Sequence, residues 1–458
     1  MKRFISILLS LLMLSSLLVG CGGNEAESSI TESGTEGEPQ ESSKTEELKP
    51  VIITGNPNYA NVALNKAYKT SDLHPKDAPS YPDEDGKGMT DGIRPSETAK
   101  YSDKAYMGFS KSSFDYDANG YSSITVDLGG IYYLDKFVAS TASCAFESVG
   151  IDAPEFVWIY LSNDGKSWYR AGKTSHVNDP KKNTVETVLT LESAYTAQYV
   201  QYRFAAGAGS WIFVSEVEAY GIKADEAMPY PDQTPEKKIL FVGNSTTYFF
   251  NIPDKLFLLC EAAGMNIKVE YCCGGGAYLS QYANASSDLG KLFRNKLNAD
   301  SYDYVVLQDN GNADNAESDP ALDILVPLIR AKGAEIVLYK RYSSNSDPAQ
   351  RLNSAYRHEV NYSLLAKTFS IEKVAPGADA YLICTEKYPK INLYHTDNSH
   401  HNHAGAYMMA CVFAITYLGL DVTDNSYLAG LDEKTASALK ECAKLACEQG
   451  YDYPQDNK

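Results

Sequence analysis

The change of pattern near residue 237 constrains the fold more than any other feature of this sequence. From there to residue 458, short apolar runs alternate with segments of helical periodicity. The runs that read as buried strands are KKILFVG, IKVEYCC, YDYVVLQ and AEIVLYK. Because parallel strands need crossover helices between them, this alternation predicts an α/β doubly wound parallel sheet over residues 237–458. Ligands of such sheets bind at the carboxyl ends of the strands.

Local signals set the limits of several helices in this region. Pro253 suits the first turn of a helix, and Gly333 suits the end of another. Asn402 and Gly419 delimit an apolar helix, and a final helix is expected over 432–449. The run ADAYLIC, residues 378–384, is predicted to be one more strand. The histidine-rich stretch after it is then expected near a strand-to-helix connection.

Residues 55–223 have a different pattern. Short alternating or apolar runs such as SSITVDLGG, KFVASTA, VETVLTL and AQYVQYRF are separated by Gly, Asn and Asp. Many short strands with turn signals between them predict a β-sandwich or jelly roll. Residues 224–236 are rich in Pro and acidic residues and are predicted to be a linker. The sequence therefore predicts a multi-domain chain, a β-sandwich followed by the α/β domain.

The first 50 residues carry export signals rather than a fold. Residues 1–20 have a basic start, an apolar run shorter than a bilayer span, and small residues before Cys21. The LVGC sequence resembles the lipobox of bacterial lipoproteins, which implies cleavage before Cys21 and its lipidation. An ordinary secretory signal is the alternative. Residues 21–50, rich in Glu, Ser and Gly, predict a disordered tether. We therefore expect export and a lipid anchor at Cys21 in the cell membrane, with the protein facing outside.

Charge and cysteine usage exclude some classes of protein. The net charge of −18 argues against nucleic-acid binding, which needs clustered Lys and Arg. No CxxC pair occurs, so a zinc ribbon is not expected. Cys411 and Cys442 read as small buried hydrophobic residues. Disulfide pairing is left open.

Four of the seven histidines lie in residues 394–407, YHTDNSHHNHAGAY. Histidine is both a common metal ligand and a common general base. A zinc site made of His395, His400, His401 and His403 is one interpretation, although no helical HExxH arrangement accompanies it. A catalytic base among them is the other, and a merely polar loop is the third.

Other polar or glycine-rich segments follow the predicted strands. Ser245 lies in VGNSTT after the first strand, Gly276 in GGGAY after the second, and Asn310 in QDNGN after the third. Together with Asp397-x-x-His400 they occur in the order of the SGNH hydrolase family, the GDSL-like esterases, which residues 237–424 resemble. The resemblance implies a serine esterase.

The resemblance also implies a role for each residue. Ser245 would be the nucleophile, His400 its base, and Asp397 the residue that orients the imidazole. Backbone N–H groups of Ser245 and Gly276, with the side chain of Asn310, would form the oxyanion hole. The sequence departs from the family at Asn244, Gln308 and His401, and Gly275 and Asn312 are rival oxyanion donors. The simpler alternatives are that Ser245 caps a helix and Asn310 is a turn residue.

Residues 61–221 resemble the discoidin, or coagulation-factor type C, family. The motifs that carry the resemblance are NVALNKAY, MTDGIRP, ITVDLGGIYYLDKFV, PEFVWIYLSNDGKSWYRAG and WIFVSEVEAYG. Members include carbohydrate-binding modules that often hold a structural Ca²⁺. Asp91 and Glu218 are candidate ligands, because Ca²⁺ prefers oxygen donors; a turn aspartate is the alternative for Asp91. The sequence does not identify the residues that contact sugar.

These readings together predict a surface-anchored esterase that removes an acyl group, with acetyl expected, from a glycan. No cofactor is expected for catalysis. The alternative is a glycan-binding surface lipoprotein with a weak or inactive hydrolase domain. A lipid, thioester or peptide ester substrate is also left open, since the sugar assignment rests on fold-level analogy.

Overall fold

A computed structural model describes residues 50–71, 81, 83, 86–110, 119–174, 181–206, 211–309 and 315–454. Residues 50–458 form one compact unit. The predicted signal peptide, the tether and Cys21 lie outside the described residues, so these expectations stay predictions.

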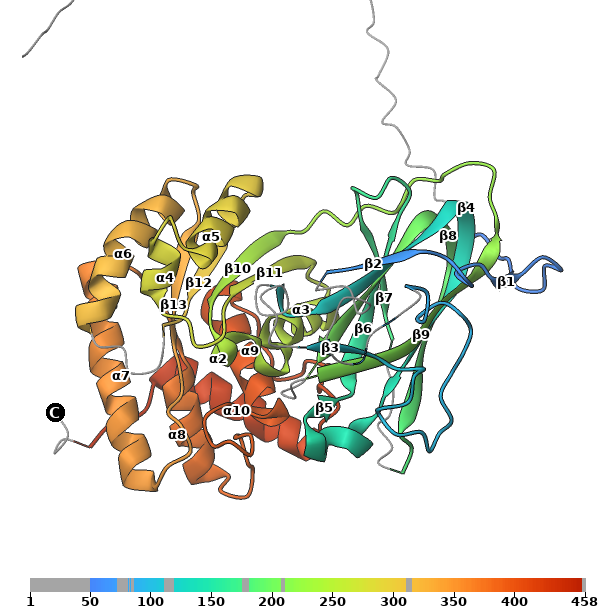
Figure 1. Cartoon of the computed structure of the whole chain (residues 1–458). Coiled ribbons are helices and arrows are strands. Elements are labelled where there is room, and N and C mark those ends of the chain that lie inside the picture. Colours follow the sequence, from blue (N-terminus) through green and yellow to red (C-terminus); the bar gives the residue numbers. More distant parts are fainter. Residues whose placement is uncertain are drawn as a thin grey trace, which may run out of the picture. The chain divides into compact units, whose positions relative to one another are not determined.

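The N-terminal part of this unit is a curled β-sheet (Figure 1). Among the described residues its strand order is β1-β9-β4-β8-β6-β7, with β2 on β4 and with β3 and β5 on β9. All pairs are antiparallel except β5 with β9. The strands are β1 Ala60–Asn61, β2 Tyr68–Thr70, β3 Met107–Ser110, β4 Ser122–Ala142, β5 Ile151–Asp152, β6 Pro154–Ser162, β7 Tyr169–Lys173, β8 Thr184–Ala206 and β9 Trp211–Lys223.

Two strands are much longer than the sequence predicts. SSITVDLGG and KFVASTA belong to one strand, β4, and VETVLTL and AQYVQYRF belong to β8. The β4–β8 register shifts between Asp127 and Tyr132, where Gly129 has φ of +72°. A bulge with a left-handed glycine bends a strand without ending it. In β4 the glycines therefore mark a bend within one long strand rather than a turn between two short ones.

The C-terminal part contains the predicted parallel sheet. Its order is β11-β10-β12-β13-β14, and every neighbouring pair is parallel. The chain leaves β10 toward one side for β11 and crosses back to the other side for β12, which makes the end of β10 a topological switch point. The strands are β10 Lys237–Gly243, β11 Ile267–Cys273, β12 Tyr304–Leu307, β13 Glu335–Lys340 and β14 Lys373–Pro376.

Helices cover both faces of this sheet (Figure 1). The predicted limits of α9 are confirmed, since the Asn402 side chain accepts from the Gly405 N–H and Gly419 ends the helix with φ of +65°. The helices are α2 Ser245–Tyr248, α3 Ile252–Ala262, α4 Leu279–Ala283, α5 Asp288–Ala299, α6 Asn315–Arg330, α7 Pro348–Thr368, α8 Gly377–Lys387, α9 His403–Leu418 and α10 Glu433–Gln449, with 3-10 turns η2 Cys144–Val149 and η3 Phe249–Asn251.

The prediction that ADAYLIC is a strand is wrong, because these residues lie in helix α8. The last described strand of the sheet is β14, directly before it. Most of the run is buried, so its apolar residues show no amphipathic period, and a short apolar run of this kind fits a strand or a buried helix equally well. The histidine-rich loop consequently joins α8 to α9 rather than a strand to a helix.

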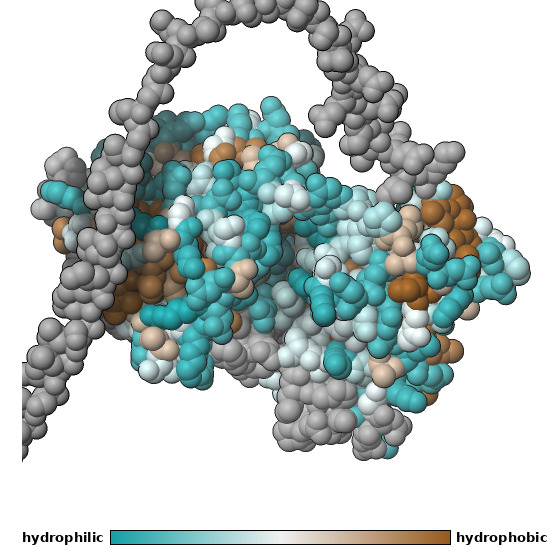
Figure 2. Space-filling model, turned by 90° about the horizontal axis from the view of Figure 1, so that it is seen from above, coloured by the Kyte–Doolittle hydropathy of each residue, from teal (hydrophilic) through white to brown (hydrophobic). Residues whose placement is uncertain are grey.

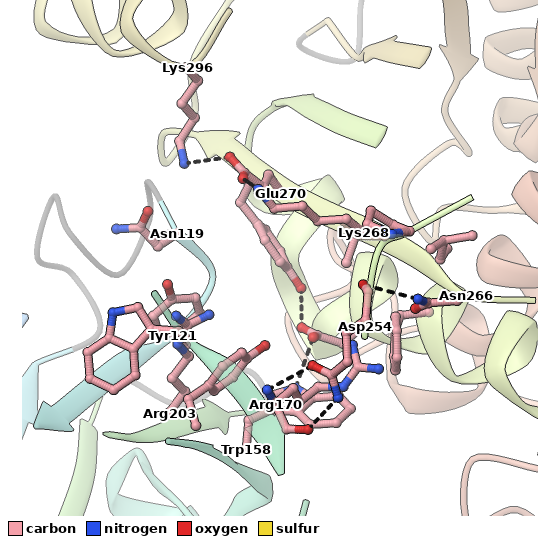
Figure 3. A pocket seen from close by; sticks show the side chains of 18 residues that line it. Asn119, Tyr121, Trp158, Arg170, Arg203, Asp254, Asn266, Lys268, Glu270 and Lys296 are labelled. Carbon is pink, nitrogen blue, oxygen red and sulfur yellow. Dashed lines mark hydrogen bonds and ion pairs between the residues drawn. The ribbon is translucent and has the colours of Figure 1, made fainter. Parts of the chain in front are cut away.

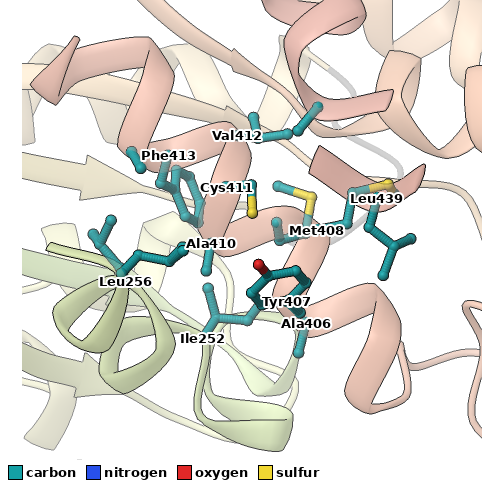
Figure 4. Packing of buried hydrophobic residues seen from close by; sticks show 14 of the residues in the cluster. Ile252, Leu256, Ala406, Tyr407, Met408, Ala410, Cys411, Val412, Phe413 and Leu439 are labelled. Carbon is teal, nitrogen blue, oxygen red and sulfur yellow. The ribbon is translucent and has the colours of Figure 1, made fainter. Parts of the chain in front are cut away.

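Alternate side chains of the parallel strands pack on opposite faces of the sheet, so the sheet separates two core layers. Ile239 and Phe241 of β10 pack with α3, α9 and α10, whereas Leu240 and Val242 pack with the helices of the other face. Figure 4 shows Ile252 and Leu256 of α3 facing α9 in the first of these layers. Cys411 and Cys442 are fully buried, as the sequence predicts, and neither forms a disulfide among the described residues.

The face of the molecule seen in Figure 2 is largely hydrophilic, with small hydrophobic patches. Within the described ranges, no helix is both long enough and apolar enough to cross a bilayer.

Candidate active site

Ser245 lies where β10 passes into α2, at the carboxyl edge of the parallel sheet. Its neighbour Asn244 is the N-cap, and the Asn244 side chain accepts hydrogen bonds from the Thr246 N–H at 3.1 Å and the Thr246 hydroxyl at 2.9 Å. The interpretation of Ser245 as a helix cap is therefore wrong. As the first residue of the helix, Ser245 has a backbone N–H without an intrahelical acceptor, and its side chain is half-buried.

The structure brings Ser245, His400 and Asp397 together. His400 Nε2 lies 2.7 Å from Ser245 Oγ, and His400 Nδ1 lies 2.7 Å from Asp397 Oδ2. An ionised carboxylate can only accept, so Nδ1 carries the hydrogen of that contact. Nε2 is then the acceptor for the Ser245 hydroxyl, which is the tautomer that a general base requires.

A tight turn holds the acid–base pair in place. Asp397 Oδ1 accepts the backbone N–H groups of Ser399 and His400 at 2.8 and 2.9 Å. Asn398 has φ of +58°, a conformation that Asn tolerates better than most residues, and Asn345 binds its carbonyl and side chain at 2.8 and 2.9 Å. Burial raises the pKa of Asp397, but the hydrogen bonds from His400 and Ser399 outweigh it and hold that pKa well below its usual range. Asp397 is therefore a carboxylate at neutral pH.

Phe249 fixes the imidazole from the other side. Its ring stacks on the His400 ring, with centroids 3.9 Å apart and planes 15° from parallel. The Phe249 carbonyl is bonded by Nε2 of the fully buried His401, whose Nδ1 lies 3.0 Å from the Tyr342 hydroxyl. Burial lowers the pKa of His401 to about 3, so this ring is neutral.

The remaining histidines have partners of their own. His395 Nδ1 lies 3.2 Å from Asp397 Oδ2, and His403 Nδ1 lies 3.2 Å from Glu155 Oε1. Over the described part of the chain, no group of three or more His, Cys, Asp or Glu side chains is placed to hold a metal ion. The four histidines thus have separate roles, and His400 is the one in contact with a serine hydroxyl.

Of the predicted oxyanion donors, the structure describes Ser245 and Gly276. Asn310 and its rival Asn312 lie outside the described residues. Gly276 has φ of +66°, and a Cβ at this position would face open space. Its turn is tied to the residue before Ser245, because Asn244 Nδ2 donates to the Ala277 carbonyl at 3.0 Å. The turn that contains Gly276 is therefore bonded to the turn that contains Ser245, and the role of Gly276 as an oxyanion donor stays a prediction.

Asn244 and Gln308, two positions at which the sequence departs from the SGNH pattern, are hydrogen-bonded to each other. Gln308 Oε1 accepts the Asn244 N–H at 2.8 Å and the Thr247 hydroxyl at 3.0 Å, and Gln308 is buried. A Cβ on Gly243 would lie 2.6 Å from Gln308 Oε1 and 2.5 Å from Thr247 Oγ1, so this position requires glycine. Gln308 thus supports the serine turn from the neighbouring strand.

Asp91 and Glu218, the predicted calcium ligands, both have hydrogen-bond partners within the protein. Glu218 is engaged by Arg94 and by the Tyr220 hydroxyl, and Asp91 Oδ1 accepts the Ile93 N–H at 2.7 Å. Glu216, by contrast, has a buried oxygen, Oε1, for which the described residues supply no hydrogen-bond partner. Burial, with the nearby Asp91 and Glu218, raises the pKa of Glu216 to about 8. The Glu218 carboxylate is thus already engaged, whereas the described residues leave one oxygen of Glu216 without a hydrogen bond.

A separate cavity of about 440 Å³ lies between the β-sheet part and β11 (Figure 3). Its walls include Trp158, Arg170, Arg203 and Tyr271, but Ser245, His400 and Asp397 do not line it. Its carboxylates are paired: Asp254 accepts from Trp158 and Tyr271, and Glu270 accepts from lysines. The chemistry of the serine site therefore does not extend into this cavity.

The sequence did not predict Phe249 as part of the site, and it identified Gln308 as a departure from the family pattern without predicting its role. Phe249 lies four residues after Ser245, and the run of three aromatic residues at 248–250, just after the predicted serine turn, was a usable signal. The signal for Gln308 was a polar side chain directly after the apolar run YVVL, at a strand end where buried amides support loops.

Several solved structures resemble parts of this chain. A DUF4886 family protein from Bacteroides uniformis ATCC 8492 is 17% identical over 48% of this chain and 99% of that one, with a TM-score of 0.43. A protein from Slackia heliotrinireducens, provisionally assigned as an SGNH hydrolase, is 23% identical over 39% of this chain and 98% of that one, with a TM-score of 0.33. Chitosan-binding module 1 of a chitosanase/glucanase from Paenibacillus sp. IK-5 is 20% identical over 36% of this chain and 99% of that one, with a TM-score of 0.23.

No family model and no curated protein matches the sequence. At these identities and TM-scores the structural likenesses carry no functional conclusion, which has to come from the geometry of the site.

Proposed function

We propose that the protein is a serine esterase that hydrolyses acyl esters, with acetyl esters of a glycan as the expected substrates. One observation carries the proposal: Ser245 Oγ, the His400 ring and Asp397 form a continuous chain of two 2.7 Å contacts. A serine hydroxyl is a weak nucleophile at neutral pH unless an adjacent base takes its proton.

The reaction follows from the direction of these hydrogen bonds. Ser245 Oγ attacks the acyl carbonyl carbon while its proton passes to His400 Nε2. The Asp397 carboxylate stabilises the resulting imidazolium through Nδ1–H. The tetrahedral intermediate collapses, the alcohol oxygen takes the proton from Nε2, and the acyl group remains on Ser245. Water, deprotonated by the same nitrogen, then releases the acid and restores the serine.

The glycan assignment is supported by the resemblance of residues 61–221 to discoidin-like modules. A lipid anchor at Cys21 would place the enzyme on the outer face of the cell membrane. Metabolic labelling with a fatty acid, compared between the native chain and Cys21→Ser, tests the anchor; equal labelling of both chains would contradict it.

Hydrolysis of p-nitrophenyl acetate tests the chemistry. The native chain is expected to hydrolyse this ester. Ser245→Ala and His400→Ala are expected to lose the activity but to keep the unfolding temperature of the native chain. Insensitivity to a chelator is also expected. Full activity in Ser245→Ala would contradict the mechanism. If the native chain binds a glycan but hydrolyses no acylated glycan, the result would favour the binding-protein alternative.

A structural Ca²⁺ near Asp91 is the remaining proposal, with Glu216 as the ligand that best fits. Calcium added to chelator-treated protein is expected to raise the unfolding temperature, and Glu216→Gln is expected to remove the effect. An unchanged unfolding temperature in the native chain would contradict it.

A further inference from the structure

A half-buried glutamate of the β-sheet part lies among groups of the α/β part. Glu155 lies in the otherwise apolar run of β6, and its Oε1 and Oε2 accept from Lys255 Nζ at 2.6 and 2.7 Å. Lys255, on α3, is fully buried. Burying the Lys255 ammonium costs desolvation free energy, so a gain in stability is a weak explanation for this ion pair.

The pair is connected to the turn that follows the serine helix. Lys255 Nζ also donates to the Phe250 carbonyl at 2.6 Å, and Asn251 Nδ2 donates to Glu155 Oε2 at 3.0 Å. Phe250 and Asn251 both have left-handed backbones, with φ of +49° and +54°. Two successive non-glycine residues in this region persist only where surrounding contacts fix them. Glu155 and Lys255 supply such contacts.

This turn carries the ring that packs on the catalytic imidazole. Phe249 precedes Phe250, and its ring lies 3.9 Å from the His400 ring, centroid to centroid. Glu155 also reaches the other side of the site, since His403 Nδ1 lies 3.2 Å from its Oε1 and His403 begins α9, three residues after His400. One carboxylate thus contacts both segments that flank the Ser245–His400 pair.

The surroundings of Glu155 are packed as a core rather than as a loose domain contact. Phe156 and Trp158 of β6 belong to the same buried cluster as residues of α3 and α9. Trp158 Nε1 donates to Asp254 Oδ1 of α3 at 3.0 Å, as Figure 3 shows. The predicted linker is fixed too, because Gln233 bonds the backbone N–H and carbonyl of Arg170 at 3.0 and 2.8 Å. The β-sheet part is therefore docked on the helix that Lys255 belongs to.

We propose that Glu155 is a positioning residue for the esterase reaction, so that the β-sheet part completes the active site instead of serving only as a targeting module. Glu155 touches neither the serine nor the acyl group. It acts through the 249–251 turn, which sets the orientation of His400. The kinetic side of this inference rests on the proposed esterase function.

The test compares three variants in the full chain, purified in detergent. Glu155→Gln removes the carboxylate. Glu155→Leu combined with Lys255→Met removes both charges, which avoids an unpaired buried lysine and keeps the fold. Trp158→Phe is the matched control, because it removes a hydrogen bond from the same strand to the same helix without touching the turn. Measured quantities are kcat and KM, unfolding temperature, and amide hydrogen exchange of residues 249–252.

We expect kcat to fall about 10- to 100-fold in Glu155→Gln and in the double variant, with KM nearly constant, because a misplaced base costs rate rather than binding. Exchange at 249–252 should rise in both. The double variant should recover the native unfolding temperature without recovering kcat, and Trp158→Phe should keep kcat near native. Native kcat in the double variant, or equal losses in all three chains, would overturn the proposal. An inactive native chain would refute the esterase function, and unchanged exchange at 249–252 would refute the positioning role independently.

Discussion

The ring of Phe249 lies on the ring of His400, with centroids 3.9 Å apart and planes inclined by 15°. A base that must accept a proton from Ser245 and later return it to the alcohol has to keep one ring orientation. The stack restricts one face of the imidazole, and the Asp397 contact restricts the edge that carries Nδ1.

Replacing Phe249 by Leu is expected to lower kcat about 10-fold with little change of KM, since the imidazole gains rotational freedom. Phe249→Tyr, which keeps the aromatic face, is the control and should remain near native. Steady-state kinetics on p-nitrophenyl acetate measure the difference. Equal kcat for the Leu and Tyr variants would show that the stack does not position the base.

Asp397→Asn is expected to reduce kcat by about 10³- to 10⁴-fold, because the amide no longer stabilises the imidazolium and permits the wrong tautomer. The low pKa of Asp397 means that its protonation does not limit the native enzyme at mildly acidic pH. His395→Gln is the matched control, as His395 also contacts Asp397 but not Ser245. A loss as large in the control would assign the effect to the loop rather than to the carboxylate.

Much of the α/β part could be predicted from the sequence because its signals are local. Pro253, Asn402 and Gly419 mark helix limits that depend on backbone geometry alone. The residues Ser245, Asp397 and His400 follow from their order in the resembled family, and the structure places their side chains in contact. Neither step required knowledge of long-range packing.

What the sequence did not predict depends on distant partners. ADAYLIC is a helix because neighbours bury it on most sides, and the apolar run itself does not distinguish the two states. The partner of Glu218 is Arg94, 124 positions away in the chain, and no sequence pattern indicates this ion pair. Glu155 and Lys255 are 100 positions apart in the chain, and only the docking of β6 on α3 brings them together.

Gln308→Leu is expected to destabilise the fold by about 1–3 kcal/mol, because the Asn244 N–H would be left buried without its acceptor. The serine turn should also loosen, so kcat should fall together with stability. Urea denaturation followed by circular dichroism measures the free energy of unfolding, and an unchanged midpoint for the Leu variant would contradict the role of this side chain.

The buried ring of His401 is expected to make the free energy of unfolding depend on pH in the acid range. Burial lowers its pKa from 6.5 to about 3 in the folded chain. Between these pH values the unfolded chain binds a proton that the folded chain does not. The stability that depends on the neutral ring is therefore fully present above about pH 6.5 and is lost as the pH falls toward 3.

The matched variant is His401→Gln, whose amide can still donate to the Phe249 carbonyl and accept from the Tyr342 hydroxyl. Each pH unit between 6.5 and 3 is expected to cost the native chain about 1.4 kcal/mol more than this variant, because one proton is bound on unfolding. Contributions from Glu216 and Glu155 are common to both chains and cancel in the difference. Urea denaturation at pH 7.5, 6 and 5 measures it. Parallel pH profiles for the two chains would mean that His401 is protonated in the folded protein, and that the hydrogen bond from its Nε2 to Phe249 does not depend on a neutral ring.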